Sequence, residues 1–272
     1  NFTCFIPCSR TRSNNFTLVA TAMVSEGLRF RVLNVVLAPQ RQFTGDLYLA
    51  NDLQSGEPAI FYMDVHNEYN LVNLLASPET LDETLIGTAL EEYRPGLRLL
   101  AGGVDSGNLQ GDRSADLFIA LNHLMQMFDR IVINVGTLES RHWVRALGIH
   151  ARHLLVAMHP LVDQAHAVRS LGNDWRSHLG RDSQVSLVVD GVDSHVPPGL
   201  DELADTAGVP LLGGLPMDWR YRLLAMNSGL PIHEQSPRCR YSRTLQALVG
   251  KLEMQQDDVT SSSWWQRVRS NG

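Results

Sequence analysis

The sequence predicts an α/β protein with a doubly wound, mostly parallel sheet of seven or eight strands and helices on both faces. Two observations predict this class. Short apolar runs rich in β-branched residues alternate with amphipathic stretches of helix length, which is the pattern of repeated strand–helix–strand units. Several runs are continuously apolar rather than alternating, as expected of parallel strands that helices cover on both faces.

The expected strands are the short apolar runs, taken in chain order. They are Phe2–Cys8, Phe30–Leu37, Leu97–Ala101, Arg130–Val135, His153–Met158, Gln184–Asp190 and Val209–Leu212. The segment Arg41–Asn70 holds two further short apolar runs, Leu47–Leu49 and Ala59–Met63, separated by a polar break. We predict that this segment is an excursion after the second strand.

The expected helices are the amphipathic stretches that cover the crossovers between these strands. They are Asn15–Glu26, Leu81–Tyr93, Ala115–Phe128, Glu139–Leu147, Leu161–Leu179, Gly199–Ala207, Asp218–Asn227 and Arg240–Met254. The last has Tyr241, Leu245, Leu248 and Leu252 at spacings of three and four, which predicts an apolar stripe packed on the sheet.

We predict one domain over residues 1–255, followed by a polar tail over residues 256–272. The tail contains Trp264 and Trp265, which we interpret either as part of a loosely packed terminus or as a docking handle. The sequence starts at Asn1 rather than at a methionine, and we expect a further domain to precede it in the full protein.

Composition excludes several classes of function. The 272 residues are 44% hydrophobic and 19% charged, and no apolar run approaches the roughly 20 residues that a membrane span needs. A formal charge of -6 argues against nucleic acid as a partner, because binding along phosphate backbones needs a basic surface. Three cysteines cannot all pair internally, and Cys4 and Cys8 would share one face of a strand, so we expect free thiols and a cytoplasmic location.

No catalytic residue and no metal site is predicted from local patterns. The closest histidine pairs, His150 with His153 and His159 with His166, lack the helical spacing with a nearby acid that zinc hydrolases use. Ser106 lacks the turn that exposes a serine nucleophile. We interpret these side chains as ordinary surface or packing residues.

A series of phrases from Glu79 onward occurs in the order and at the spacings of a known family. They read LDETL at 81–85, GLRLLA at 96–101, FDRIVIN at 128–134, RHLLVAMHP at 152–160, LVVDGVD at 187–193, and GVPLLGGLPMD at 208–218 with NSGLP at 227–231. Taken together and in this order, these phrases resemble the ATPase-like domain of the TadZ/CpaE proteins of the Tad (Flp) pilus system, a branch of the MinD/ParA superfamily. The resemblance implies a P-loop NTPase fold and covers most of residues 79–254.

The resemblance also implies where a nucleotide would bind. Active members hold ATP in a loop of the form K-G-G-x-G-K-T-T, in which backbone N–H groups and a lysine neutralise the phosphates. The corresponding stretch has neither glycine nor lysine, and Asn14 or Asn15 stands in the place of the lysine. It comprises Ser9, Arg10, Thr11, Arg12, Ser13, Asn14, Asn15, Phe16 and Thr17.

Three more positions differ from an active member. The second strand reads Asn34-Val35-Val36-Leu37 without a carboxylate, and the strand of the Walker B motif ends in Asn134. An amide cannot supply the negative charge that binds magnesium and orients the attacking water. Asp190 replaces the asparagine that reads the purine base, so we expect no cofactor and no ATP hydrolysis.

The opposing hypothesis is that Arg10 and Arg12 replace the lysine. Arginine binds phosphate well, so the chain would then hold ATP with magnesium weakly and hydrolyse it slowly. Such a protein would be an ATPase of the MinD/ParA type serving a pilus or another envelope or motility system.

The resemblance implies a non-catalytic assembly and polar localisation factor of the Tad/Flp pilus secretion machinery, that is, a pseudo-ATPase. It implies a homodimer that lies peripherally on the cytoplasmic face of the inner membrane, at the cell pole. Its expected partners are other Tad proteins, including the secretion ATPase and inner-membrane components, and the preceding domain is expected to be receiver-like.

Overall fold

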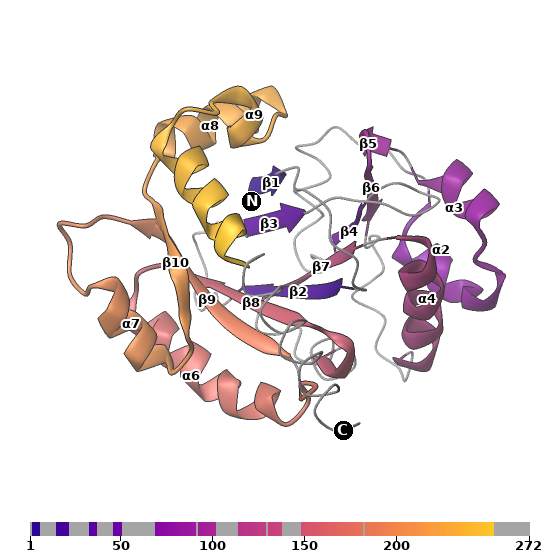
Figure 1. The fold of residues 1–272 in the computed structure, drawn as a ribbon, viewed down its shortest axis with the longest axis horizontal. Helices are drawn as coiled ribbons and strands as arrows, with labels where there is room; N and C mark the ends of the chain where they lie inside the picture. The colour runs from indigo at the N-terminus through magenta and orange to yellow at the C-terminus, as the bar shows by residue number, and fades with distance from the viewer. Residues whose placement is uncertain are drawn as a thin grey trace, which may run out of the picture.

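The fold was analysed in a computed structural model, which describes residues 2–5, 15–21, 33–36, 46–50, 69–90, 92–101, 114–128, 130–137, 148–181 and 183–252. Its centre is an eight-stranded sheet in the order β10-β9-β8-β2-β7-β4-β6-β5, drawn in Figure 1. All neighbouring strands of this sheet run parallel except the edge pair β5 and β6. The prediction of a doubly wound, mostly parallel α/β fold is confirmed.

The strands of the main sheet match most of the predicted apolar runs. The main sheet contains β2 (Asn15–Thr21), β4 (Asp46–Ala50), β5 (Glu92–Arg94), β6 (Leu97–Ala101), β7 (Arg130–Thr137), β8 (His153–Met158), β9 (Gln184–Val192) and β10 (Leu211–Pro216). The bounds of β6 and β8 are those predicted from the sequence.

The first two predicted runs do not join this sheet. They contain β1 (Phe2–Phe5) and β3 (Leu33–Val36), which pair with each other in parallel as a separate two-stranded sheet. The main sheet contains β2 and β4 instead.

The described helices also follow the predicted crossovers. They are α2 (Leu71–Ala76), α3 (Glu83–Ala89), α4 (Ser114–Met127), α6 (Val162–Arg176), α7 (Leu200–Ala207), α8 (Trp219–Ser228) and α9 (Ile232–Gln235), with 3-10 turns η1 (Pro78–Thr80) and η4 (Gly148–His150) and a C-terminal helix over 240–252. The predicted helix Glu139–Leu147, the run Ala59–Met63 and the tail lie outside the described residues.

The prediction of a helix over Asn15–Glu26 is wrong where the structure describes it. Asn15–Thr21 is strand β2, hydrogen-bonded to β7 on one side and to β8 on the other. The run Phe16–Val19 is aromatic, β-branched and apolar, and such residues favour a strand covered on both faces.

Two other predictions need correction. The excursion Arg41–Asn70 contains β4, which lies in the main sheet between β7 and β6 rather than outside it. The predicted helix Leu81–Tyr93 ends at Ala89, and Glu92–Arg94 forms the antiparallel edge strand β5. Gly96, with φ of 82°, makes the tight turn between β5 and β6 that a helix through Tyr93 would have excluded.

Helices bury both faces of the sheet. On one face, Leu154 and Val156 of β8 belong to a buried cluster with Val168 and Leu171 of α6. On the other face the C-terminal helix packs on β10, where Leu248 lies against Gly213. The predicted stripe of Tyr241, Leu245, Leu248 and Leu252 is buried, which confirms that this helix closes the fold.

Gly180 packs closely against the segment that precedes β8, and a substitution at this glycine tests that packing. A Cβ atom added to Gly180 would lie 2.7 Å from the backbone oxygen of Ile149, so Gly180→Ala is expected to lower the free energy of unfolding by about 1–3 kcal/mol. The matched control is Gly172→Ala in α6, where nothing lies within 4 Å of an added Cβ. That variant is expected to gain about 0.5–1 kcal/mol, because alanine favours the helix. Urea unfolding followed by circular dichroism measures both, and equal stability of the two variants would contradict the described packing.

Candidate functional site

The carboxyl ends of the parallel strands meet along one edge of the sheet. β2, β7, β8 and β9 run parallel and in register, and they end at Thr21, Thr137, Met158 and Val192. Open α/β sheets bind ligands outside this edge, where the strand order reverses. The candidate site is therefore sought in the segments that follow these strands.

The last three residues of the expected phosphate loop lie in strand β2. Ser9–Asn14 lie outside the described residues, whereas Asn15, Phe16 and Thr17 begin β2 and pair with Arg130, Ile131 and Val132. These three residues lie at the amino end of the sheet, opposite the ligand edge. Their assignment to a phosphate loop is corrected, because a loop at the carboxyl edge of this central strand must follow Thr21.

Residues 22–32, which follow β2, carry one glycine, Gly27, and no lysine. The whole sequence contains a single lysine, Lys251, in the C-terminal helix. Its Nζ donates a hydrogen bond to the backbone oxygen of Leu212, 3.3 Å away, near the amino end of β10. No segment can therefore supply a phosphate-loop lysine, wherever that loop lies. A count of lysines gives this result from the sequence, and our sequence analysis missed it.

The predicted Walker B residue lies near the ligand edge. Asn134 of β7 is the register partner of Val19 in β2 and of Ala50, the last residue of β4. The strand that pairs with β7 on this side is β4, whereas the predicted second strand contributes β3 to the small sheet. Asp52 follows β4 in the sequence, and it is a carboxylate that the earlier strand assignment overlooked.

Asp190, at the predicted base-contact position, is held by an arginine from α8. Arg222 Nη1 donates to Asp190 Oδ2 at 2.8 Å, and Arg222 Nη2 donates to Asp190 Oδ1. The two side chains are 7% and 18% exposed, and the guanidinium lies 5.0 Å from the centre of the Tyr241 ring. Burial acts to lower the pKa of Arg222, but the hydrogen bond to Asp190 and its charge outweigh this, so the pKa is raised. Both carboxylate oxygens of Asp190 already accept charge-assisted bonds.

Close packing surrounds this ion pair. His159 Nδ1 donates to the backbone oxygen of Asp190 at 3.1 Å, and the His159 backbone N–H donates to Oε1 of the buried Gln164 at 2.7 Å. Gly191 has φ of 84°, and a Cβ added there would lie 3.4 Å from Met217 Cε and 3.7 Å from His159 Nδ1. The ends of β8, β9 and β10 are thus held together at the position where a base would be read.

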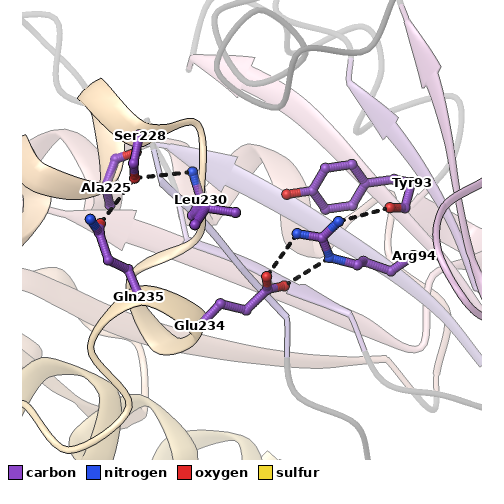
Figure 2. A network of polar contacts seen from close by, with 7 residues as sticks. All are labelled: Tyr93, Arg94, Ala225, Ser228, Leu230, Glu234 and Gln235. Carbon is purple, nitrogen blue, oxygen red and sulfur yellow. Dashed lines mark hydrogen bonds and ion pairs between the residues drawn. The ribbon is translucent and has the colours of Figure 1, made fainter.

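A second polar cluster ties α9 to the far edge of the sheet. Figure 2 shows Glu234 of α9 pointing toward Arg94 of β5, with Arg94 Nη2 donating to Glu234 Oε2 at 2.8 Å and Arg94 Nε donating to Oε1 at 3.3 Å. In the same cluster Ser228 Oγ bonds Oε1 of Gln235 at 3.0 Å, which joins the end of α8 to α9. The α8–α9 unit is therefore fixed at two points.

The remaining candidate residues do not gather into a reaction centre. Among the described residues no group of three or more histidine, cysteine, aspartate or glutamate side chains could hold a metal ion. Of the histidine pairs considered as metal ligands, His153 is buried and His159 is hydrogen-bonded to the backbone of β9. Within the same residues no helix is long and apolar enough to cross a membrane.

These features define the fold class: a doubly wound, mostly parallel sheet in which β2 lies between β7 and β8. The chain has the fold of the MinD/ParA P-loop NTPases. A ParA family ATPase from Chlorobium tepidum TLS superposes with a TM-score of 0.71 at 14% identity, covering 88% of this chain and 99% of that one.

Two MinD structures share the fold as well. MinD from Pyrococcus horikoshii OT3, complexed with Mg-ADP, gives a TM-score of 0.61 at 13% identity over 87% of this chain and 96% of that one. MinD from Aquifex aeolicus in its complex with MinC gives 0.63 at 11% identity over 88% and 96%. No protein-family model and no curated protein sequence matches the chain. At these identities the likeness establishes the fold alone.

Proposed function

We propose that the protein is a pseudo-ATPase that acts as an assembly and localisation factor on a MinD/ParA-type scaffold. The observation that carries this proposal is the single lysine of the chain, Lys251, which bonds Leu212 near the amino end of the sheet. A triphosphate needs a cation and flexible backbone N–H donors at the carboxyl edge of β2. The segment that follows β2 has one glycine and no lysine, and its two cations are Arg29 and Arg31.

The ion pair at the base-contact position supports the same proposal. Asp190 can only accept hydrogen bonds, and both of its oxygens are engaged by Arg222. A purine that approached this carboxylate would have to displace a largely buried arginine. The cost of leaving that charge unpaired makes the exchange unfavourable.

The more specific role rests on the ordered phrases that resemble TadZ/CpaE. We assign the chain to polar localisation and assembly of the Tad/Flp pilus secretion machinery, as a homodimer on the cytoplasmic face of the inner membrane. Its partners would be the secretion ATPase and inner-membrane components of that system. The complex of MinD with MinC is a case in which this scaffold binds another protein.

A phosphate-release assay tests the loss of catalysis. The purified chain with ATP and magnesium is expected to release phosphate no faster than a protein-free control. Magnesium-dependent turnover that scales with protein concentration would refute the proposal. Combined substitution of Arg29→Gln and Arg31→Gln, in the segment that follows β2, is the matched control, because it abolishes any turnover that depends on these arginines.

The second candidate function is an ATPase that still binds and slowly hydrolyses ATP. Arg29 and Arg31 in the segment that follows β2, together with Asp52 after β4, are the residues that favour it, because Arg10 and Arg12 precede β2. If it is correct, phosphate release will be slow but measurable, and the double arginine variant will lose it.

A further inference from the structure

The outer surface of α8 and its flanks is apolar. Met217, Trp219, Leu223, Leu224 and Leu230 are between 38% and 62% exposed, and they make up half of the ten large apolar side chains that are exposed in the described part of the chain. A surface helix normally buries its apolar residues and exposes its polar ones. α8 does the reverse, because Arg222 is on its buried side.

The same part of the chain is basic. Residues 217–243 carry five arginines and two carboxylates, a formal charge of +3, so the rest of this chain of charge -6 carries -9. Arg222 and Glu234 are already paired, with Asp190 and Arg94. Arg220, Arg238, Arg240 and Arg243 are exposed. Of the ion pairs between described residues, none involves these four arginines.

The fold presents these residues together on a fixed support. α8, α9 and the C-terminal helix gather at one corner of the molecule in Figure 1. The Asp190–Arg222 pair holds α8 from beneath, the Arg94–Glu234 pair holds α9 from the side, and Arg222 stacks on Tyr241 of the C-terminal helix. The apolar side chains therefore stand outward without rearrangement.

We propose that this corner, defined by the exposed apolar residues of 217–230 and the exposed arginines of 220–243, binds the surface of an anionic lipid bilayer. A helix with tryptophan and leucine on its outer face and arginines beside it can bury the apolar side chains at the head-group boundary while the guanidinium groups contact phosphates. The basic charge of this corner, set against the overall charge of -6, favours an anionic surface as the occupant. The inference rests on the proposed localisation at the inner-membrane face and is independent of the loss of ATP binding.

Cosedimentation with vesicles tests the proposal. The full chain is expected to bind vesicles of phosphatidylcholine containing about one third phosphatidylglycerol, to bind pure phosphatidylcholine poorly, and to dissociate as salt is raised. The combined variant Leu223→Ser with Leu224→Ser is expected to weaken binding about tenfold or more. The variant Arg220→Gln with Arg240→Gln is expected to reduce binding to anionic vesicles and its dependence on salt.

Matched controls keep this result specific. Ile149→Ser and Val196→Ser remove exposed apolar side chains elsewhere and should leave binding unchanged, with circular dichroism confirming that every variant is folded. Failure of the wild-type chain to bind anionic vesicles would overturn the proposal, as would binding that is lost on changing Trp264 and Trp265 but not Leu223 and Leu224. If the leucine variant changes self-association, measured by sedimentation, but not vesicle binding, the corner is an interface with a second copy of the chain instead. None of these outcomes alters the phosphate-release result.

Discussion

Arg222→Leu is expected to lower the free energy of unfolding by about 3 kcal/mol. The substitution leaves the Asp190 carboxylate, 18% exposed, without the guanidinium that binds both of its oxygens. Removing one partner of a buried ion pair leaves an uncompensated charge, which costs about 3–5 kcal/mol, and the partial exposure of Asp190 places this case at the low end. Urea unfolding at neutral pH measures the loss.

Two further variants separate this charge effect from lost packing. Combining Asp190→Leu with Arg222→Leu removes both charges and is expected to recover most of the loss. Glu234→Gln breaks the more exposed pair with Arg94 and is expected to cost less than about 1 kcal/mol. A double variant as unstable as Arg222→Leu would show that the ion pair is not what holds α8 against β9.

Acid is expected to destabilise the protein through His153. This side chain is 1% exposed at the start of β8, and neither ring nitrogen has a hydrogen-bond partner among the described residues. Burial, with a smaller effect of Arg152, lowers the pKa of His153 from 6.5 to about 4. Between these pH values the unfolded chain takes up a proton that the folded protein does not, so stability falls with falling pH by up to about 3 kcal/mol in total. Above pH 6.5 the histidine is neutral in both states, and below about pH 4 it is protonated in both, so the loss is confined to this window.

Urea unfolding at several pH values measures this dependence. His153→Leu should lose less stability than the wild-type chain between pH 7 and pH 4, because no histidine is left to titrate at this position. The control Leu155→Ala in the same strand should be less stable by about 2–5 kcal/mol at every pH, without a change in the pH dependence. Parallel pH profiles for the wild type and His153→Leu would contradict the buried, unpaired state of this histidine.

The strands with continuous apolar runs could be predicted from the sequence because burial on both faces leaves little ambiguity. Every residue of β8 (His153–Met158) is buried, and its bounds were predicted as observed. The stripe of the C-terminal helix was predicted for the same reason, since Leu245 and Leu248 recur at helical spacing.

β2 and β4 could not be placed because their short runs fit more than one structure. Asn15–Thr21 is compatible with a strand or with the start of a helix, and only pairing with β7 and β8 decides between them. The expectation that Phe2–Cys8 and Phe30–Leu37 belong to the main sheet was wrong, because their strands β1 and β3 pair only with each other. Residues 15–17 of the expected phosphate loop are therefore the start of β2.

The ion pair between Asp190 and Arg222 also could not be predicted from the sequence. Asp190 and Arg222 are 32 residues apart, and no local pattern links them. The aspartate at position 190 suggested that a base contact is missing. Only the fold shows that Arg222 binds this carboxylate.

The central claim is that the chain has given up ATP binding, and a calorimetric titration with ATP and magnesium tests it most directly. The claim predicts no binding heat at ATP concentrations up to about 1 mM, because the only lysine is Lys251 and Asp190 is bound to Arg222. Saturable, magnesium-dependent binding with a Kd of about 1 μM would contradict it.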